Sequence, residues 1–267
     1  MEISLSNVNY LDKLVDINCK FESGKVTSII GKSGSGKSLL GFIIMKLVKC
    51  EKGHVLVDGM SLYDNHKFMK DVGYVFQNPF DHFFCDNVFD EVSFGLKQFK
   101  FKLGKINKQV SDALKMVGLD DSYMYKKINS LSSGEAERIA IASSLVLNPK
   151  VLILDEPTIY LDFKVKKSLI ELVKLLKDKY NKTVIVISND MDFVYSVSDN
   201  YLLMDSGKIV KYGNVKDIMS DDVDLCSYGM EIPLIKQFIN MVKEKKGIDL
   251  GNVTDIDELV EEVINNV

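Results

Sequence analysis

The sequence predicts an α/β fold with a parallel sheet, a helical insertion and a small helical part at the C-terminus. Residues 151–154 and 183–187 are short and wholly apolar, which is the pattern of parallel strands buried on both faces. Residues 26–30 form a third strand-like segment, which leads into a glycine-rich loop and then an apolar helix at residues 39–48. Strand, glycine loop and helix in this order form the βα unit from which such sheets are built.

The other elements follow from local patterns. Residues 1–30 alternate as strands do, residues 55–59 predict a strand and turn, and residues 72–76 predict a strand that ends at Gln77. From about residue 87 to residue 147 the apolar period moves towards 3.6, which predicts helices and no strong strand. Residues 201–204 and 208–211, on either side of Ser206-Gly207, predict a closing hairpin.

The C-terminal part carries two apolar stripes at helical spacing, separated by residues 247–254. The stripes are formed by Ile235, Phe238, Ile239 and Val242, and by Ile256, Leu259, Val260, Val263 and Ile264. Two amphipathic helices after a finished α/β domain predict an appendage that buries its apolar faces against something.

Composition sets the broad class. The 267 residues suffice for one large α/β domain with an appendage, or for two small domains. A net charge of −4 gives no electrostatic case for a nucleic-acid partner. Four dispersed cysteines without a CxxC pair suggest reduced packing residues of a cytosolic protein, and three dispersed histidines give no protein-held metal site. We expect no signal peptide, and no apolar run approaches the roughly 20 residues of a membrane span.

The glycine-rich loop predicts a nucleotide site. It reads Gly31-Lys32-Ser33-Gly34-Ser35-Gly36-Lys37-Ser38. Its glycines let backbone N–H groups converge on phosphates at the positive end of the next helix. Lys37 would place a charge near the β- and γ-phosphates of ATP, and the Ser38 hydroxyl suits Mg²⁺. The alternative is a glycine turn at the surface.

Two carboxylates follow the apolar strand at residues 151–154. Asp155 is aimed at the nucleotide end of the sheet, where it can hold Mg²⁺ through water, and Glu156 can orient or deprotonate the attacking water. The structural alternative is that an acidic pair merely stops the strand. Upstream, Ser132 and Glu135 have the spacing of a capping box, which predicts a helix start and also an anion site.

With these residues in place, the chain resembles the ATP-binding-cassette (ABC) ATPases over residues 1 to about 220. The resemblance rests on Leu131-Ser132-Ser133-Gly134-Glu135 (the signature segment), on Asp155-Glu156 (Walker B) and on Leu161-Asp162 (the D-loop). It implies a P-loop NTPase fold, with a RecA-like core, an antiparallel β subdomain and an α-helical subdomain at about residues 85–148. The ABC ATPase domain would span residues 1–222, and residues 223–267 would form a C-terminal helical domain.

The resemblance also implies roles. Glu156 would be the catalytic base, and Gln77 the Q-loop glutamine that contacts Mg²⁺ or the lytic water. Asp155 and Ser38 would serve the metal, and Tyr10 would stack on adenine. Ser132, Ser133, Gly134 and Glu135 would reach across a dimer to the γ-phosphate held by the other subunit, with Asp162 at the seam between the two.

Three positions depart from the family pattern. Asn189 stands where the family usually places the switch histidine, so its amide would have a shorter reach and carry no positive charge. Losing one well-aimed stabiliser costs about 10²–10³ in rate, so this chain's own site is expected to be slow. Ser133 replaces the first of two usual glycines, and Glu135 stands where the family often has Gln. Such asymmetry is what a heterodimer tolerates.

A narrower resemblance, to the ATPases of energy-coupling factor (ECF) importers, extends to the C-terminus. It rests on residues 75–79 and 92–96, and in the tail on Ile232-Pro233, Lys246-Gly247, Thr254 and residues 257–259, whereas Asp81-His82 departs from it. It implies that residues 223–267 form a dimerisation domain. The implied partners are a second ABC ATPase, a transmembrane coupling protein and a substrate-binding membrane protein, with membrane contact only through them.

The importers of this family take up vitamins or transition-metal ions, and their ATPases sit at the cytoplasmic face of the cell membrane. Asp86, Asp90 and Glu91 could receive arginines of the coupling protein, or could simply form an acidic helix start. Two other functions stay open: a weakly hydrolysing regulatory subunit, and a soluble ABC ATPase without a transporter. A P-loop kinase would have no use for the signature segment.

Overall fold

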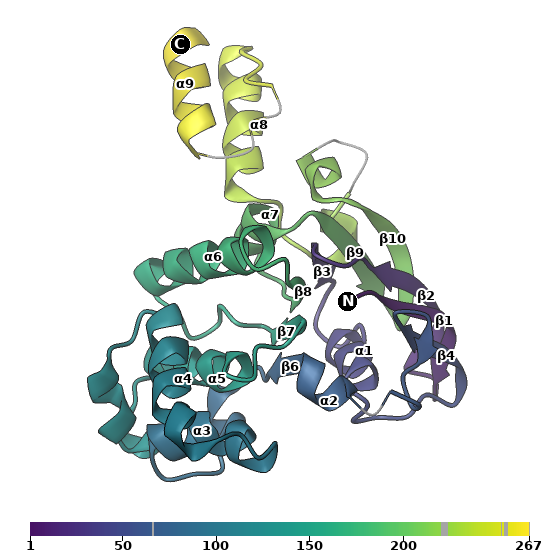
Figure 1. Ribbon diagram of the computed structural model, residues 1–267. Helices are drawn as coiled ribbons and strands as arrows, with labels where there is room; N and C mark the ends of the chain where they lie inside the picture. The colour runs from purple at the N-terminus through teal and green to yellow at the C-terminus, as the bar shows by residue number, and fades with distance from the viewer. Residues whose placement is uncertain (66, 220–223, 252, 254–255, 267) are drawn as a thin grey trace.

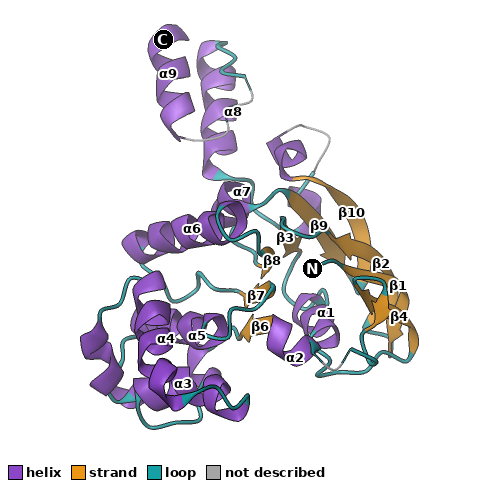
Figure 2. Cartoon of the chain, viewed as in Figure 1, coloured by secondary structure: helices purple, strands orange, loops and turns teal. Residues whose placement is uncertain are grey.

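The computed structural model describes residues 1–65, 67–219, 224–251, 253 and 256–266 (Figure 1). A central sheet lies between a helical lobe on one side and a second, antiparallel sheet on the other, while the last two helices project from this body (Figure 2). Thr254, and His66 as one of the three dispersed histidines, lie outside the described residues.

The central sheet has six strands in the order β10-β9-β3-β8-β7-β6. The strands from β9 to β6 are mutually parallel, and β10 closes the edge as an antiparallel hairpin with β9. The strands are β3 (Val26–Ile30), β6 (Val72–Val75), β7 (Val151–Asp155), β8 (Thr183–Ile187), β9 (Asn200–Asp205) and β10 (Lys208–Asn214). Every residue of β3, β7 and β8 is buried, which explains the apolar runs at residues 151–154 of β7 and 184–187 of β8.

The second sheet is antiparallel, in the order β2-β1-β4-β5. It comprises β1 (Ile3–Tyr10), β2 (Leu14–Phe21), β4 (Lys52–Val57) and the short β5 (Met60–Ser61). Helix α1 (Lys37–Ile44) packs between the two sheets, since its buried Leu40 and Ile44 share one apolar cluster with Ile3 and Phe21 of this sheet and Ile153 of the central one. Helix α2 (Phe68–Asp71) leads into β6.

The chain between β6 and β7 forms the helical lobe. It contains α3 (Val88–Gln98), α4 (Leu103–Met116), α5 (Ser133–Leu145) and a 3-10 turn, η2 (Asp121–Tyr125). The Asn87 side chain caps α3 by accepting from the Asp90 N–H at 2.8 Å. Because Val92, Val110 and Ile139 pack into one cluster that also holds Leu154 of β7, the lobe joins the central sheet through apolar contacts.

Helices α6 (Phe163–Asp178) and α7 (Met191–Val197) pack on the same face of the central sheet as the lobe. The chain then continues into the tail helices, α8 (Leu234–Lys246) and α9 (Ile256–Asn266). Ile239 is buried in a cluster with Val194 of α7 and Tyr201 of β9, so the first predicted stripe is anchored on the body. Phe238 is 42% exposed and Ile264 is 75% exposed, however, so part of each stripe faces solvent.

The predicted α/β class, with parallel and antiparallel sheets and a helical insertion, is confirmed. No helix in the described part of the chain combines the length and the apolar character that a membrane crossing requires.

Candidate active site

The glycine-rich loop joins β3 to α1, and its conformation explains its glycines. Gly31, Gly34 and Gly36 have φ of +144°, +82° and +101°, where residues with a Cβ are strained. A Cβ at Gly31 would lie 2.1 Å from the Met204 carbonyl oxygen, and one at Gly36 would lie 2.8 Å from Leu14 Cδ2. The loop is therefore held against β9 and β2 in a form that only glycine allows.

Lys37 lies inside this loop. Its side chain is buried, and its Nζ donates to the carbonyl oxygens of Gly31 at 2.5 Å and Lys32 at 3.1 Å. Burial lowers the pKa of Lys37, while the nearby Glu156 and Asp155 carboxylates act to raise it. The ammonium is thus positioned by backbone oxygens at the start of α1.

Asp155 ends β7 and is almost fully buried. Its Oδ2 accepts from the Tyr74 hydroxyl at 2.7 Å, and its Oδ1 accepts from Ser38 Oγ at 3.2 Å. Burial raises the pKa of Asp155, and these two hydrogen bonds oppose that rise. Burial also raises the pKa of Tyr74, so this hydroxyl keeps its proton and remains a donor. The carboxylate is therefore oriented from both sides.

Glu156 has a φ of +49°, which is uncommon for a residue with a side chain. Its N–H donates to the Ile187 carbonyl oxygen at 2.7 Å, which holds the backbone in place. Its Oε2 accepts from the Asn189 N–H at 3.2 Å and from Ser188 Oγ at 3.3 Å. Burial raises the pKa of Glu156, which brings the carboxylate closer to the proton affinity of a useful general base.

These groups meet in a cleft of about 940 Å³. The predicted residues that line it are Ser33, Gly34, Gly36, Lys37, Ser38, Gln77, Glu156 and Asn189. It is also lined by residues that the sequence analysis did not predict for this site, namely Asp12, Lys13, Leu39, Phe42, Thr158, Ile159, Asp190, Ser206 and Gly207. The cleft therefore joins the P-loop, the Q-loop glutamine, the Walker B glutamate and the switch position.

Other predicted residues lie outside this lining. Tyr10 is half-buried at the end of β1, and its neighbours Asp12 and Lys13 line the cleft instead, so adenine stacking by Tyr10 stays a prediction. Gly31, Lys32 and Ser35 belong to the loop behind the lining, where Lys32 forms an ion pair with Asp205 at 3.0 Å.

The signature segment and the D-loop also lie outside the cleft, at helix N-termini. Ser132 Oγ accepts from the Glu135 N–H at 3.3 Å and Glu135 Oε2 accepts from the Ser132 N–H at 2.8 Å, which is the predicted capping box. Asp162 caps α6 by accepting from the Val165 N–H at 2.9 Å. Neither contact completes this chain's own cleft, so the roles of Ser132, Ser133, Gly134, Glu135 and Asp162 across a dimer stay predictions.

The residues present fit a magnesium nucleotide. Ser38 Oγ and Asp155 Oδ1 offer hard oxygen donors 3.2 Å apart beside the Lys37 ammonium. In the described part of the chain no group of three or more His, Cys, Asp or Glu side chains could hold a metal. The oxygen set suits Mg²⁺ bound through one carboxylate, one hydroxyl and phosphate oxygens.

Two residues that hold the Walker B carboxylates were also not predicted from the sequence. Tyr74 lies within the predicted strand, and Ser188 follows the predicted strand of β8, yet both hold the Walker B carboxylates by hydrogen bonds. The position of Ser188 at the carboxyl end of a parallel strand was a usable signal. Nothing local marks Tyr74, because its partner is distant in the sequence.

Comparison with known proteins decides the family, since the family model described as ABC transporter matches residues 14–159. The chain belongs to the ABC transporter ATPases. As the site geometry indicates, this ABC ATPase is an enzyme that hydrolyses ATP.

Several relatives of this ABC ATPase carry a common name. It is 36% identical to the energy-coupling factor transporter ATP-binding protein EcfA1 of Ligilactobacillus salivarius, over 90% of this chain and 84% of that protein. It is 31% identical to EcfA2 of Clostridium perfringens, over 100% of this chain and 99% of that protein. The structure of cbiO1 from Clostridium perfringens, part of the ABC transporter complex cbiONQ, matches with a TM-score of 0.76 at 31% identity, covering 92% of this chain and 95% of that one.

Proposed function

We propose that this ABC ATPase powers an ECF-type importer of a vitamin or a transition-metal ion, at the cytoplasmic face of the cell membrane. The observation that carries the proposal is the extent of the similarity to the ECF ATP-binding protein EcfA2, which covers 100% of this chain and 99% of that protein. The similarity therefore includes the tail beyond the catalytic domain, which a relationship through the ATPase motifs alone would not require.

The chain's own residues support a water-activating role. Lys37 and the P-loop amides bind and orient the phosphates, and Ser38 and Asp155 would hold Mg²⁺, which neutralises phosphate charge when it is bound. Glu156 is held by Ser188 and by the Asn189 N–H, with its carboxylate on the cleft wall. We infer that Glu156 takes the proton of the attacking water and that Gln77 orients that water.

The proposed partners are a second ABC ATPase, in a heterodimer, a transmembrane coupling protein and a substrate-binding membrane protein. A surface beside the Q-loop suits the coupling protein, because Phe84 is 79% exposed and its ring stacks on Phe94 at 5.9 Å between centroids. Asp86 is exposed next to this aromatic pair. An apolar segment with a basic residue would fit both features.

Glu91 does not belong to that surface. It is buried, and its Oε2 accepts from the N–H groups of Phe84 at 2.8 Å and Cys85 at 2.9 Å. Asp90 is paired with Lys97 at 2.7 Å. Of the three acidic residues predicted to receive arginines, Asp86 therefore remains the candidate, because Glu91 instead orders the loop that presents Phe84.

The test is to tag this chain, solubilise its native membranes gently and identify the co-purifying proteins by mass spectrometry. A second ABC ATPase together with two membrane proteins is the expected result, and the smaller membrane protein would indicate the solute. Recovery only from the soluble fraction, with ribosomes, repair proteins or nothing, would refute the importer and leave the soluble ABC ATPase.

Asn189 favours a second candidate, a weakly hydrolysing regulatory subunit in the same heterodimer. Its N–H holds Glu156 at 3.2 Å, and its exposed side chain faces the cleft at the switch position. Since an amide reaches less far than an imidazole and carries no charge, we infer a slow site in this chain. If this site is slow, Asn189→His should raise the ATP turnover of the purified complex, because a second site would then contribute to hydrolysis. No change would indicate a competent site.

A further inference from the structure

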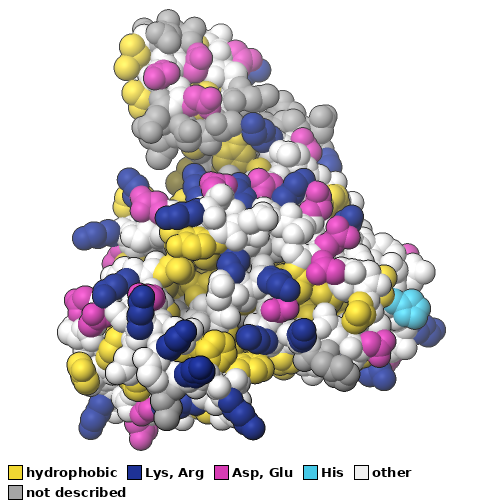
Figure 3. Space-filling model, viewed as in Figure 1, with side chains coloured by type: hydrophobic (Ala, Val, Ile, Leu, Met, Phe, Trp, Pro, Cys, Tyr) yellow, Lys and Arg dark blue, Asp and Glu magenta, His cyan; other side chains and the backbone are white. Residues whose placement is uncertain are grey.

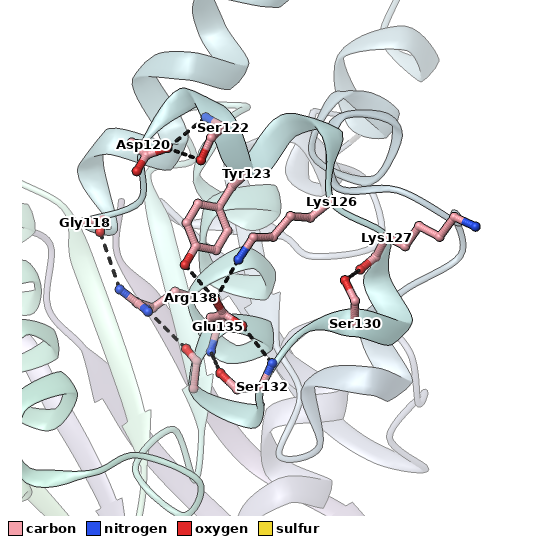
Figure 4. A network of polar contacts seen from close by, with 11 residues as sticks. Gly118, Asp120, Ser122, Tyr123, Lys126, Lys127, Ser130, Ser132, Glu135 and Arg138 are labelled. Atoms are coloured by element: carbon pink, nitrogen blue, oxygen red, sulfur yellow. Dashed lines mark hydrogen bonds and ion pairs between the residues drawn. The ribbon is translucent and has the colours of Figure 1, made fainter.

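A network of polar contacts ties the signature segment to η2, the 3-10 turn at Asp121–Tyr125 (Figure 4). Glu135 Oε1 accepts from the Tyr123 hydroxyl at 2.6 Å and from Lys126 Nζ at 3.0 Å. The other carboxylate oxygen, Oε2, accepts from the Ser132 N–H at 2.8 Å. The Lys126 ammonium also lies 3.8 Å from the centroid of the Tyr123 ring. Both oxygens of Glu135 are therefore fixed.

The charge of Glu135 conflicts with the expected role of this helix end. A carboxylate in the first turn stabilises α5 through the helix dipole, but it also repels any phosphate that approaches the same N-terminus. The contacts with Tyr123 and Ser132 lower the pKa of Glu135 to about 2, so the repulsion is present at every physiological pH. A compensating cation is needed for the N-terminus to remain an anion site.

Lys126 supplies that cation at close range. Its ammonium forms an ion pair with Glu135, whose side chain is only 18% exposed, so the pair is partly shielded from solvent. The neighbouring Lys127 extends away from Glu135 in Figure 4. The pair turns the Glu135 carboxylate back towards η2 and leaves Gly134 open, where an added Cβ would meet no atom closer than 3.9 Å.

We propose that Lys126 is a positioning residue for phosphate recognition, which cancels the Glu135 charge so that the signature segment accepts the γ-phosphate of the partner subunit's ATP. Tyr123 assists by holding both members of the pair. The inference rests on the proposed dimer and names the residues that adapt the signature segment to a Glu where the family often has Gln. The alternative is a purely structural role, in which the network only holds η2 against α5.

Five variants, assayed in the intact complex, separate charge compensation from fastening. Lys126→Met should raise the KM for ATP about tenfold with a smaller change in kcat, because the uncompensated carboxylate repels the phosphate. Lys126→Arg should stay near the wild type. Lys127→Met is the matched control for removing a neighbouring surface lysine. The double variant Lys126→Met/Glu135→Gln should recover to within about twofold of Glu135→Gln alone.

The dependence of the KM defect on ionic strength is a second readout. A purely structural loss of the contact between η2 and α5 would not make the defect depend on salt. Raising the salt from about 0.05 M to about 0.5 M shortens the Debye length severalfold, so the Lys126→Met defect should shrink towards the wild type. A double variant as weak as Lys126→Met, or a defect independent of salt, would overturn the inference and leave the importer proposal standing. A complex that shows the expected Lys126 effects on ATP hydrolysis but takes up neither vitamin nor metal would refute the importer proposal and leave the inference about Lys126 standing.

Discussion

Glu137 should make this protein less stable as the pH rises through neutrality, and Glu137→Gln should abolish that loss. Glu137 lies on α5, two residues after Glu135, and only 1% of it is exposed. Its Oε1 has no hydrogen-bond partner in the described structure. It borders a groove of about 650 Å³ between the helical lobe and α6, where apolar side chains gather in Figure 3. A carboxylate here is desolvated without compensation.

The magnitude follows from proton linkage. Burial raises the pKa of Glu137 from 4.5 to about 8, so between these values the folded state holds a proton that the unfolded state has lost. Stability therefore falls as pH rises through this window, by up to about 1.4 kcal/mol per pH unit, or about 3 kcal/mol by pH 7. Gln has the shape of the protonated acid and does not ionise, so the variant avoids this cost.

The measurement is urea unfolding of the nucleotide-free chain at several pH values from 5 to 8. The chain has no tryptophan, so far-UV circular dichroism is the suitable probe. The variant should exceed the wild type by less than about 1 kcal/mol at pH 5, by about 3 kcal/mol at pH 7 and by about 4 kcal/mol at pH 8. Glu171→Gln, at an exposed position on α6 beside the same groove, is the control and should show no such trend. A Glu137→Gln advantage that stays constant with pH would refute the reasoning.

Three further outcomes are expected. Glu156→Gln should lower ATP hydrolysis by at least about 10² while leaving equilibrium ATP binding within a few-fold, which turnover and binding assays on one preparation will separate. Tyr74→Phe removes the 2.7 Å hydrogen bond to buried Asp155, and should cost about 1–3 kcal/mol in urea unfolding and raise the Mg²⁺ concentration for half-maximal hydrolysis. Gly41→Ala places a Cβ 2.9 Å from a core isoleucine methyl and should lower stability by about 1–3 kcal/mol, whereas Gly104→Ala, in open space on α4, should raise it.

The sequence was sufficient for elements whose cause is local. Residues 151–154 of β7 and 184–187 of β8 are apolar because both faces of these strands are covered, and that pattern is visible without a structure. The loop at Gly31–Ser38 needs positive φ at three glycines, which its composition already indicates. The capping box of Ser132 and Glu135 is likewise a property of four consecutive residues.

What the sequence did not provide depends on contacts between distant segments. Tyr74 and Asp155 are 81 positions apart and meet only because β6 and β7 are neighbours in the parallel sheet. The exposure of part of the two tail stripes could not be predicted either, because periodicity reveals an apolar face of a helix without revealing what covers that face. Tyr10 illustrates a third limit: its place at a strand end was predictable, but which of the neighbouring residues would reach the cleft was not.

This chain combines a weak switch position in its own cleft with a well-ordered signature segment for the partner's site. This asymmetry argues for the proposed heterodimer. In the chain's own cleft, Asn189 contributes a backbone N–H to Glu156 but only a short neutral side chain at the switch position. At the signature segment, by contrast, Glu135 is held by three donors, from Tyr123, Lys126 and Ser132, so the surface offered to another subunit is firmly ordered. In a homodimer both composite sites would share the weak switch. With a different ATPase that supplies a histidine, the ordered signature segment would serve the stronger site.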